Sequence, residues 1–212
     1  DDADRLRNYL EQTQLPPEEQ HVVIVGGGLL GLELAAALKH KKVKITIIQR
    51  ASRLMERQLD RISSKLLAEE VQQRDIQIYF DNEVSTVFST NRAHELEIAL
   101  KSGRTLTANA IVYTIGTIPN IEVAKEAGLT CARGVKVNQY LQSSNPSIFA
   151  IGEIAEFNNQ LFGITSAAEE QADILANYLA GDISSHYKGS VLMNILKLED
   201  INLCIIGEIE VP

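Results

Sequence analysis

Six residues near the start of the chain carry the clearest chemical signal: Gly26-Gly27-Gly28-Leu29-Leu30-Gly31 fits the pattern GxGxxG. In such a loop the first glycine permits a tight turn out of a strand, and the second lets the backbone approach a pyrophosphate. The third allows a helix to pack against the strand. The helix then presents free N–H groups and its positive dipole end to an anion. The loop therefore predicts a dinucleotide site, although a glycine-rich turn without a ligand has the same pattern.

The segments on both sides of this loop predict the elements that would position it. His21–Val25 is an apolar, β-branched run typical of a buried strand. Leu29–His40 has helical composition, and Val43–Ile48 alternates in the manner of a second strand. Together they predict a strand, a glycine turn, a helix and a strand, which is the βαβ unit of a dinucleotide-binding fold.

The end of the second predicted strand should decide which dinucleotide binds. An acidic residue there would accept both ribose hydroxyls of NAD, but this position holds Gln49, followed by Arg50 and Arg53. The two arginines either attract the 2′-phosphate of NADP or are solvated surface charges. The sequence does not decide between NADH and NADPH, but the first possibility for the two arginines would favour NADPH. Glu33 either lies near the entry of the nicotinamide end or is an acid favoured by the helix dipole.

Periodicity along the rest of the chain predicts an α/β protein. The inner face of the second large helix is expected to carry Ile62, Leu66, Leu67 and Val71. The expected helices are Asp2–Thr13, Asp60–Arg74, Ile121–Ala127 and Thr165–Leu179. The expected strands are Ile76–Phe80, Glu83–Ser89, Glu95–Ala99, Thr105–Thr107, Ala110–Ile115, Val135–Val137, Ile148–Ala150 and two within Leu192–Ile206. This order indicates a Rossmann-like, doubly wound parallel sheet with an inserted antiparallel β-meander.

Composition excludes several classes of function. A formal net charge of -8 argues against nucleic-acid binding. No apolar run is long enough to span a membrane, and the first ten residues are too acidic for a secretory signal. Cys131 and Cys204 lie far apart without a CxxC or a Cys/His cluster, so we expect no metal site, no disulfide framework and a cytoplasmic location.

Three stretches of the chain resemble the FAD-dependent pyridine nucleotide (disulfide) oxidoreductase family. IVGGGLLGLELAAALK followed by VKITIIQRASRLM is similar to its NAD(P)-binding domain. TIGTIPN at 114–120 is similar to the segment that leads back into the FAD domain, and SIFAIGE at 147–153 resembles the second FAD motif. The resemblance implies cofactor contacts from Ile115, Gly116, Gly152 and Glu153. In the family an Asp binds the flavin ribityl chain at the position of Glu153, and the helix Thr165–Leu179 points its N-terminus at the flavin.

LMERQLD at 54–60 and IGEIAEF at 151–157 narrow the resemblance to the large subunit of NAD(P)H-dependent assimilatory nitrite reductase. That branch would pass hydride from NAD(P)H to FAD and then single electrons onward, with iron–sulfur and sirohaem groups in other domains. The same module of a rubredoxin reductase, a ferredoxin reductase or an NADH oxidase is an alternative. A non-catalytic nucleotide-binding module is another. No catalytic side chain can be assigned, and without a redox cysteine pair we expect no disulfide-reductase mechanism.

The resemblance also implies a division of the chain. We expect an FAD-domain entry segment and linker at 1–20, the NAD(P)-binding domain at 21–119, the second half of the FAD domain at 120–187, and the start of a further domain at 188–212. Residues 1–20 hold no FAD-binding GxGxxG. We therefore expect a middle piece that binds FAD weakly or not at all and is inactive alone. Its expected partners are NAD(P)H, FAD and a downstream electron acceptor domain or protein.

Overall fold

The computed structural model describes residues 1–191, 193–198 and 201–206. The chain forms two compact units, each with its own core. Unit 1 comprises Asp1–Ile115 with the described residues from Ile195 onward, and unit 2 runs from Gly116 to Asn194. The two units are described separately below.

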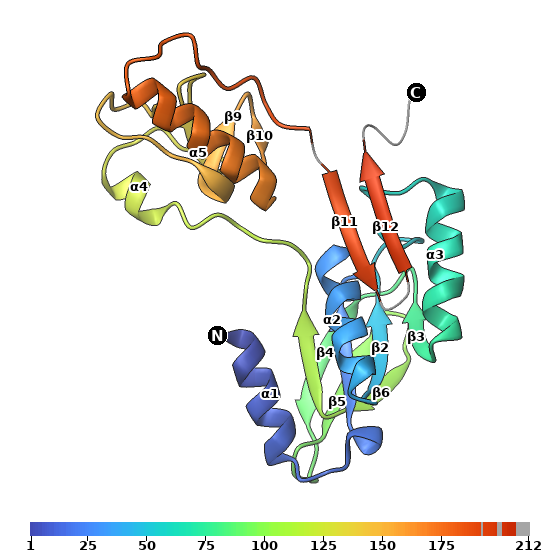
Figure 1. Ribbon diagram of the computed structural model, residues 1–212. Helices are drawn as coiled ribbons and strands as arrows, with labels where there is room; N and C mark the ends of the chain where they lie inside the picture. Colours follow the sequence, from blue (N-terminus) through green and yellow to red (C-terminus); the bar gives the residue numbers. More distant parts are fainter. Residues whose placement is uncertain (192, 199–200, 207–212) are drawn as a thin grey trace. The chain divides into compact units, whose positions relative to one another are not determined.

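Unit 1 is built on a four-stranded parallel sheet with the strand order β3-β2-β1-β7 (Figure 1). Its strands are β1 (His21–Val25), β2 (Lys44–Ile48), β3 (Ile76–Tyr79) and β7 (Ala110–Tyr113). Helix α2 (Leu29–His40) follows β1, and α3 (Arg61–Gln73) follows β2. The chain leaves β1 toward β2, whereas β7 pairs with the other edge of β1. The carboxyl end of β1 is therefore a topological switch point, where open α/β sheets bind ligands.

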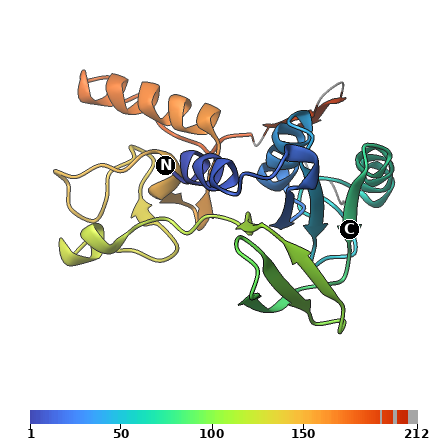
Figure 2. The same cartoon turned by 90° about the horizontal axis from the view of Figure 1, so that it is seen from below.

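Both faces of this sheet are covered, which explains its continuous apolar strands. Val22 and Ile24 pack in the core that α2 and α3 help to form, whereas Val23 packs in the core on the opposite face. That opposite face is covered by an antiparallel meander with the order β4-β5-β6, visible in green in Figure 2. The meander consists of β4 (Val84–Ser89), β5 (Leu96–Leu100) and β6 (Thr105–Ala108). The predicted α/β fold with an inserted meander is confirmed.

Short elements at both ends of the chain complete unit 1. Helix α1 (Asp2–Gln12) begins at Asp1, whose carboxylate accepts the N–H of Asp4 at 2.8 Å, and a 3-10 turn η1 (Pro17–Glu19) follows. The strands β11 (Met193–Leu198) and β12 (Ile201–Ile206) pair with each other. Leu196 is buried in the helix-side core of unit 1.

Unit 2 contains a small three-stranded sheet with the order β10-β9-β8. Strand β8 (Val135–Val137) runs parallel to β9 (Ala155–Phe157), and β10 (Gln160–Leu161) is antiparallel to β9. A short helix α4 (Glu122–Glu126) precedes the sheet, and the long helix α5 (Thr165–Leu179) follows it. A 3-10 turn, η2 (Gly152–Ile154), leads directly into β9. The core of this unit gathers Leu141, Phe157, Phe162, Ala167 and Tyr187.

The structure corrects some details of the sequence prediction. Ile148–Ala150 is not a strand: Phe149 forms only an isolated bridge with Gln142. Ile62 and Leu66 are exposed on α3, whose buried stripe instead runs through Ser64, Leu67, Ala68 and Val71. Strands β9 and β10, which are three and two residues long, were not predicted. None of the helices in the described part of the chain is long and apolar enough to cross a membrane.

Candidate functional site

The glycine loop lies between the end of β1 and the start of α2, and its glycines meet different surroundings. Gly26 has a φ of +117°, a conformation that side chains rarely adopt. A Cβ on Gly31 would lie 2.0 Å from the carbonyl oxygen of Gly26, so only glycine permits this contact between helix and loop. A Cβ on Gly28 would meet nothing within 4 Å. Open space therefore borders the loop at Gly28, where α2 begins.

Three neighbouring segments hold the loop in shape. The N–H of Gly26 donates to the carbonyl of Ile48 in β2 at 2.9 Å, and the carbonyl of Gly27 accepts the N–H of Met55 at 2.9 Å. The Thr114 hydroxyl, just beyond β7, lies 3.1 Å from the carbonyl oxygen of Gly26. The loop is thus fixed by the end of β2 and by the segments that follow β2 and β7.

Gln49 provides a further link, and its place differs from that of a ribose ligand. Its side chain is buried, and Oε1 accepts the N–H of Gly27 at 2.8 Å. Its Nε2 donates to the carbonyl of Arg53 at 3.1 Å. Both polar ends of the amide are therefore engaged within the protein. This arrangement joins the glycine loop to the loop after β2, and it does not present Gln49 to solvent.

The first turn of α2 is suited to receive an anion. Gly28 is its N-cap, no side chain caps it, and the first turn holds no acidic residue. The early N–H groups and the positive dipole end therefore meet no protein carboxylate in this turn. Leu29 packs against the core, whereas Leu30 is exposed. Glu33 lies in the second turn, half-buried, so the dipole acts on it only weakly.

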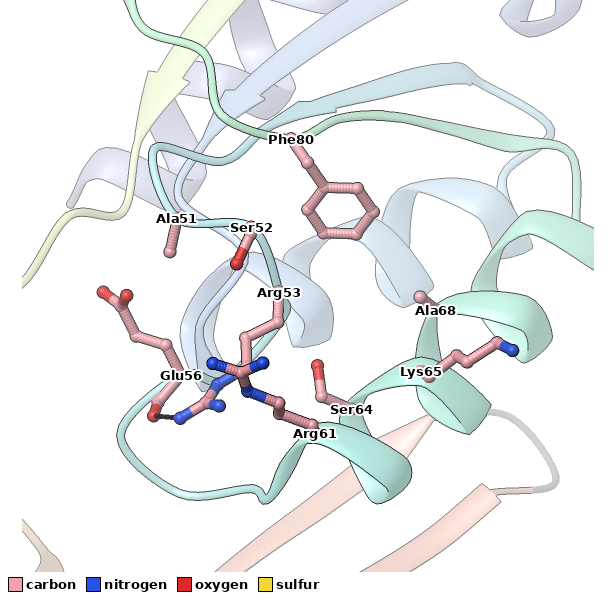
Figure 3. Close-up of a pocket in the computed structure, with 9 residues that line it drawn as sticks. All are labelled: Ala51, Ser52, Arg53, Glu56, Arg61, Ser64, Lys65, Ala68 and Phe80. Carbon is pink, nitrogen blue, oxygen red and sulfur yellow. Dashed lines mark hydrogen bonds between the residues drawn. The ribbon is translucent and has the colours of Figure 1, made fainter.

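A basic pocket of about 440 Å³ adjoins the loop after β2 (Figure 3). The ring of Phe80 points into it from the end of β3, and the guanidinium of Arg53 donates to the carbonyl of Glu56 at 3.1 Å. The lining residues are Ala51, Ser52, Arg53, Glu56, Arg61, Ser64, Lys65, Ala68 and Phe80. Two arginines and a lysine against one glutamate give the pocket a positive balance. An apolar ring beside cations suits a flat aromatic ligand that carries phosphate.

Arg50 is exposed and lies outside the residues that line this pocket. Its charge acts on Glu83, just before β4. The pKa of Glu83 is lowered chiefly by the hydrogen bond from Lys101 at 2.8 Å, and further by the positive charges of Lys101 and Arg50. Arg50 thus carries its charge at the surface near the carboxyl end of β2.

The second predicted site lies in unit 2, at the turn η2. Gly152 has a φ of +76°, and its N–H donates to Oε1 of Gln171 on α5 at 2.6 Å. Glu153 is exposed, and its carboxylate accepts the hydroxyl hydrogen of Thr117. Helix α5 begins without a side-chain cap, because neither Thr165 nor Ser166 takes that role. The turn therefore presents the carboxylate of Glu153, which can accept hydrogen bonds from the hydroxyl groups of a ligand. The hydrogen bond from Gly152 to Gln171 fixes the main chain beside it.

The predicted site residues thus fall into two groups, one in each unit. Ile115 ends unit 1 with an exposed side chain, and Gly116 begins unit 2 with a φ of +109°. Sequence reasoning assigned no role to Thr114, Thr117 or Gln171. The first two lie within the recognised segment 114–120, which could have drawn attention to them, but nothing in the sequence marks Gln171. No three His, Cys, Asp or Glu residues in the described ranges are placed to hold a metal ion.

Comparison with known proteins finds relatives among nitrate and nitrite reductases. The assimilatory nitrate reductase electron transfer subunit of Bacillus subtilis (strain 168) is 33% identical over 191 residues, covering 90% of this chain and 24% of that protein. The nitrite reductase [NAD(P)H] of the same organism is 32% identical over 198 residues, covering 92% and 24%. The chain therefore spans about a quarter of the length of these relatives.

A solved structure supports the same relationship. The ferredoxin reductase for the CYP199A2 system from Rhodopseudomonas palustris aligns with a TM-score of 0.84 and 28% identity, covering 94% of this chain and 50% of that one. Residues 1–172 match the family described as pyridine nucleotide-disulphide oxidoreductase. The chain belongs to this family, whose members are FAD-dependent NAD(P)H oxidoreductases.

Proposed function

We propose that this chain forms the NAD(P)H-binding electron-entry portion of a flavin-dependent reductase. The observation that carries the proposal is the open space beside Gly28, in front of the uncapped first turn of α2. A pyrophosphate there would accept hydrogen bonds from the free N–H groups of the turn. Gly26 and Gly31 shape the loop, and Gly27, Leu29 and Leu30 complete it. In this proposal residues 21–119 are the NAD(P)-binding domain.

The proposal includes a preference for NADPH. Gln49 cannot serve as the acid that accepts both ribose hydroxyls of NAD, because its amide is engaged with Gly27 and Arg53. Two arginines follow Gln49 in the chain. Arg50 lies at the surface, and Arg53 lines the basic pocket. The negatively charged 2′-phosphate of NADPH would be stabilised by both arginines. Glu33 remains a candidate contact nearer the nicotinamide end.

Residues 120–187 would supply part of the flavin site. The positive φ at Gly152 and the exposed carboxylate of Glu153 fit a group that carries hydroxyls, such as the ribityl chain. Ile115 and Gly116 would lie where the chain passes from one nucleotide site to the other. When bound, FAD supplies the two-electron acceptor for hydride from NAD(P)H. The protein's part is to hold and align the two cofactors, and the electrons then pass to a downstream acceptor.

We infer that this acceptor belongs to a nitrite reductase, in nitrate assimilation in the cytoplasm. The two Bacillus subtilis relatives that carry nitrate and nitrite reductase names cover 90% and 92% of this chain. Iron–sulfur and sirohaem groups would then lie outside residues 1–212. A second candidate is the corresponding module of a ferredoxin reductase, which the 28% identity to such a reductase favours.

Anaerobic spectroscopy on the protein in its full natural length tests these assignments. We expect NADPH, and less readily NADH, to bleach the visible absorbance of bound flavin. Subsequent addition of nitrite should restore the absorbance, whereas an oxidised ferredoxin should not. Restoration by ferredoxin alone would favour the second candidate. Failure of both nucleotides to bleach the flavin would indicate a non-catalytic nucleotide-binding module.

A further inference from the structure

Gln171 is a polar residue in an apolar position. It lies on α5 in the same buried stripe as Ala167, Ile174 and Leu175, which pack in the core of unit 2. The side chain has no solvent exposure, and its Nε2 has no hydrogen-bond partner among the described residues. An unpaired amide in a core is unfavourable compared with an apolar side chain of similar size. Packing alone therefore does not explain why a glutamine stands here.

The other end of the amide gives the explanation. Oε1 of Gln171 accepts the N–H of Gly152 at 2.6 Å. Because a backbone N–H can only donate, this contact fixes which end of the amide faces the turn. Gly152 has a positive φ and is the first residue of the 3-10 turn η2, so its N–H has no acceptor within that turn. Gln171 supplies the acceptor that the main chain lacks.

The residue after this pinned glycine is Glu153. Its carboxylate accepts the hydroxyl hydrogen of Thr117, from the segment that opens unit 2. The carbonyl of Gly152 accepts the N–H of Ala155, which closes the turn. Gln171 therefore fixes the main chain of the turn, and Thr117 fixes the direction of its carboxylate.

We propose that Gln171 is a positioning residue for flavin, acting through Gly152 to set the place of the Glu153 carboxylate. The inference rests on the proposed function, in which that carboxylate meets the ribityl hydroxyls. Gln171 touches no reacting atom in this scheme. Its role depends on the acceptor oxygen Oε1. Glutamine is a neutral side chain that can place this acceptor opposite Gly152, and Nε2 is buried with it because both atoms belong to the same amide.

The test compares three variants of the protein in its full natural length. Gln171→Met keeps the length of the side chain but removes the acceptor, whereas Gln171→Glu keeps an acceptor for the N–H of Gly152. Gln20→Met is the matched control, because Gln20 is also buried and its amide donates to the carbonyls of Leu10 and Leu15 in unit 1. The FAD dissociation constant, the visible spectrum of the bound flavin and thermal unfolding are measured for each.

We expect Gln171→Met to weaken FAD binding about tenfold or more and to alter the flavin spectrum, as loss of a buried hydrogen bond implies. Gln171→Glu should stay within about threefold of the natural protein, because burial favours its neutral carboxyl form, whose carbonyl oxygen keeps the acceptor. Gln20→Met should lower the unfolding temperature without changing FAD affinity. Natural FAD affinity in a folded Gln171→Met protein, or an equal loss in both Gln171 variants, would overturn the inference.

Two further outcomes are also decisive. If Gln171→Met does not fold, Gln171→Glu decides alone: retained FAD affinity supports the inference, and a tenfold loss or more contradicts it. If the unmodified protein binds no FAD, the proposed function itself fails. That result is distinguishable because it does not depend on any variant.

Discussion

Gln49 shows what a single side chain contributes at the residue scale. Its amide accepts the N–H of Gly27 and donates to the carbonyl of Arg53, so it ties the glycine loop to the segment after β2. Both partners are main-chain groups, and the N–H of Gly27 is buried. A buried N–H without an acceptor is unfavourable, and the loop therefore depends on this residue for its shape.

Replacement of Gln49 by leucine should lower the free energy of unfolding by about 1–3 kcal/mol, because the N–H of Gly27 would lose its acceptor. Denaturant unfolding measures the change. Gln72→Leu, at an exposed position on α3, is the control and should stay within about 0.5 kcal/mol of the natural chain. Equal stability of the two variants would show that the link is unimportant.

Charge reversal at Arg50 should separate the two nicotinamide cofactors. Arg50→Glu is expected to weaken NADPH binding about tenfold or more, since a carboxylate would replace a cation near the 2′-phosphate. NADH, which lacks that phosphate, should bind within about twofold of its natural affinity. Calorimetric titration gives both constants, with Arg92→Glu, in the turn between β4 and β5, as a control of the same charge change. Equal losses for both cofactors would refute the preference.

The hydrogen-bond partners of single side chains were harder to predict from the sequence than the helices and strands. The sequence places Gln49 where an acid is expected, but its inward orientation depends on Gly27, which lies far away along the chain and reaches it only after folding. Gln171 could not be identified at all, because its partner Gly152 is far away along the chain. Contacts of this kind follow from tertiary packing, and no local pattern encodes them.

At the scale of elements, the βαβ unit around the glycine loop was predicted closely. Runs of β-branched residues indicate its strands, and the glycines mark where the helix begins, so both signals are local in the sequence. β1 and α2 have the predicted bounds His21–Val25 and Leu29–His40. The buried face of α3 was predicted correctly at Leu67 and Val71 but wrongly at Ile62 and Leu66. Its stripe passes through the small residues Ser64 and Ala68, and the hydroxyl of Ser64 donates to the carbonyl of Leu54 at 2.8 Å. Hydrophobicity alone favoured Ile62 and Leu66, which the packing leaves exposed.

Alanine substitutions at two glycines between β1 and α2 should differ in their effect on stability. Gly31→Ala should destabilise the chain by about 1–3 kcal/mol or more, because its Cβ would lie 2.0 Å from the carbonyl oxygen of Gly26. Gly28→Ala should leave stability within about 0.5 kcal/mol, since its φ is -86° and its Cβ would meet open space. Denaturant unfolding of both variants checks the contrast, and similar losses would contradict it.

His21 should make the attachment of the meander sensitive to acid. Its Nδ1 lies 2.6 Å from the carbonyl oxygen of Thr107 in β6, and Nε2 lies 2.9 Å from the hydroxyl of Thr46 in β2. Burial is the main cause that lowers the pKa of His21, with a smaller effect in the same direction from the charge of Lys44; the hydrogen bond to Thr107 opposes them.

The unfolded chain therefore binds a proton at higher pH than the folded one does, and stability falls as the pH drops below about 6.5, the ordinary histidine pKa. His21→Gln should flatten this loss, because glutamine does not titrate. Unfolding free energies of both proteins between neutral pH and about pH 5 measure the two slopes. Identical slopes would show that His21 does not contribute.

At the scale of the whole molecule, the two candidate sites belong to different units. The glycine loop lies in unit 1, and the turn with Gly152 and Glu153 lies in unit 2. Each unit has its own core, and each site is pinned by hydrogen bonds within its own unit. The chain spans about a quarter of the length of its curated nitrite and nitrate reductase relatives. Nucleotide binding at the loop can therefore be tested separately from electron transfer.

Calorimetric titration of this chain with NADPH tests the claim that the Gly26–Gly31 loop binds a nicotinamide dinucleotide. Gly28→Asp is the decisive comparison, because its Cβ would meet nothing within 4 Å and its carboxylate would lie where the pyrophosphate is expected. We predict one-site binding by the natural chain and at least about a tenfold loss in the variant, with an unchanged unfolding temperature. Equal affinity in the two proteins, or no binding by the natural chain, would contradict the claim.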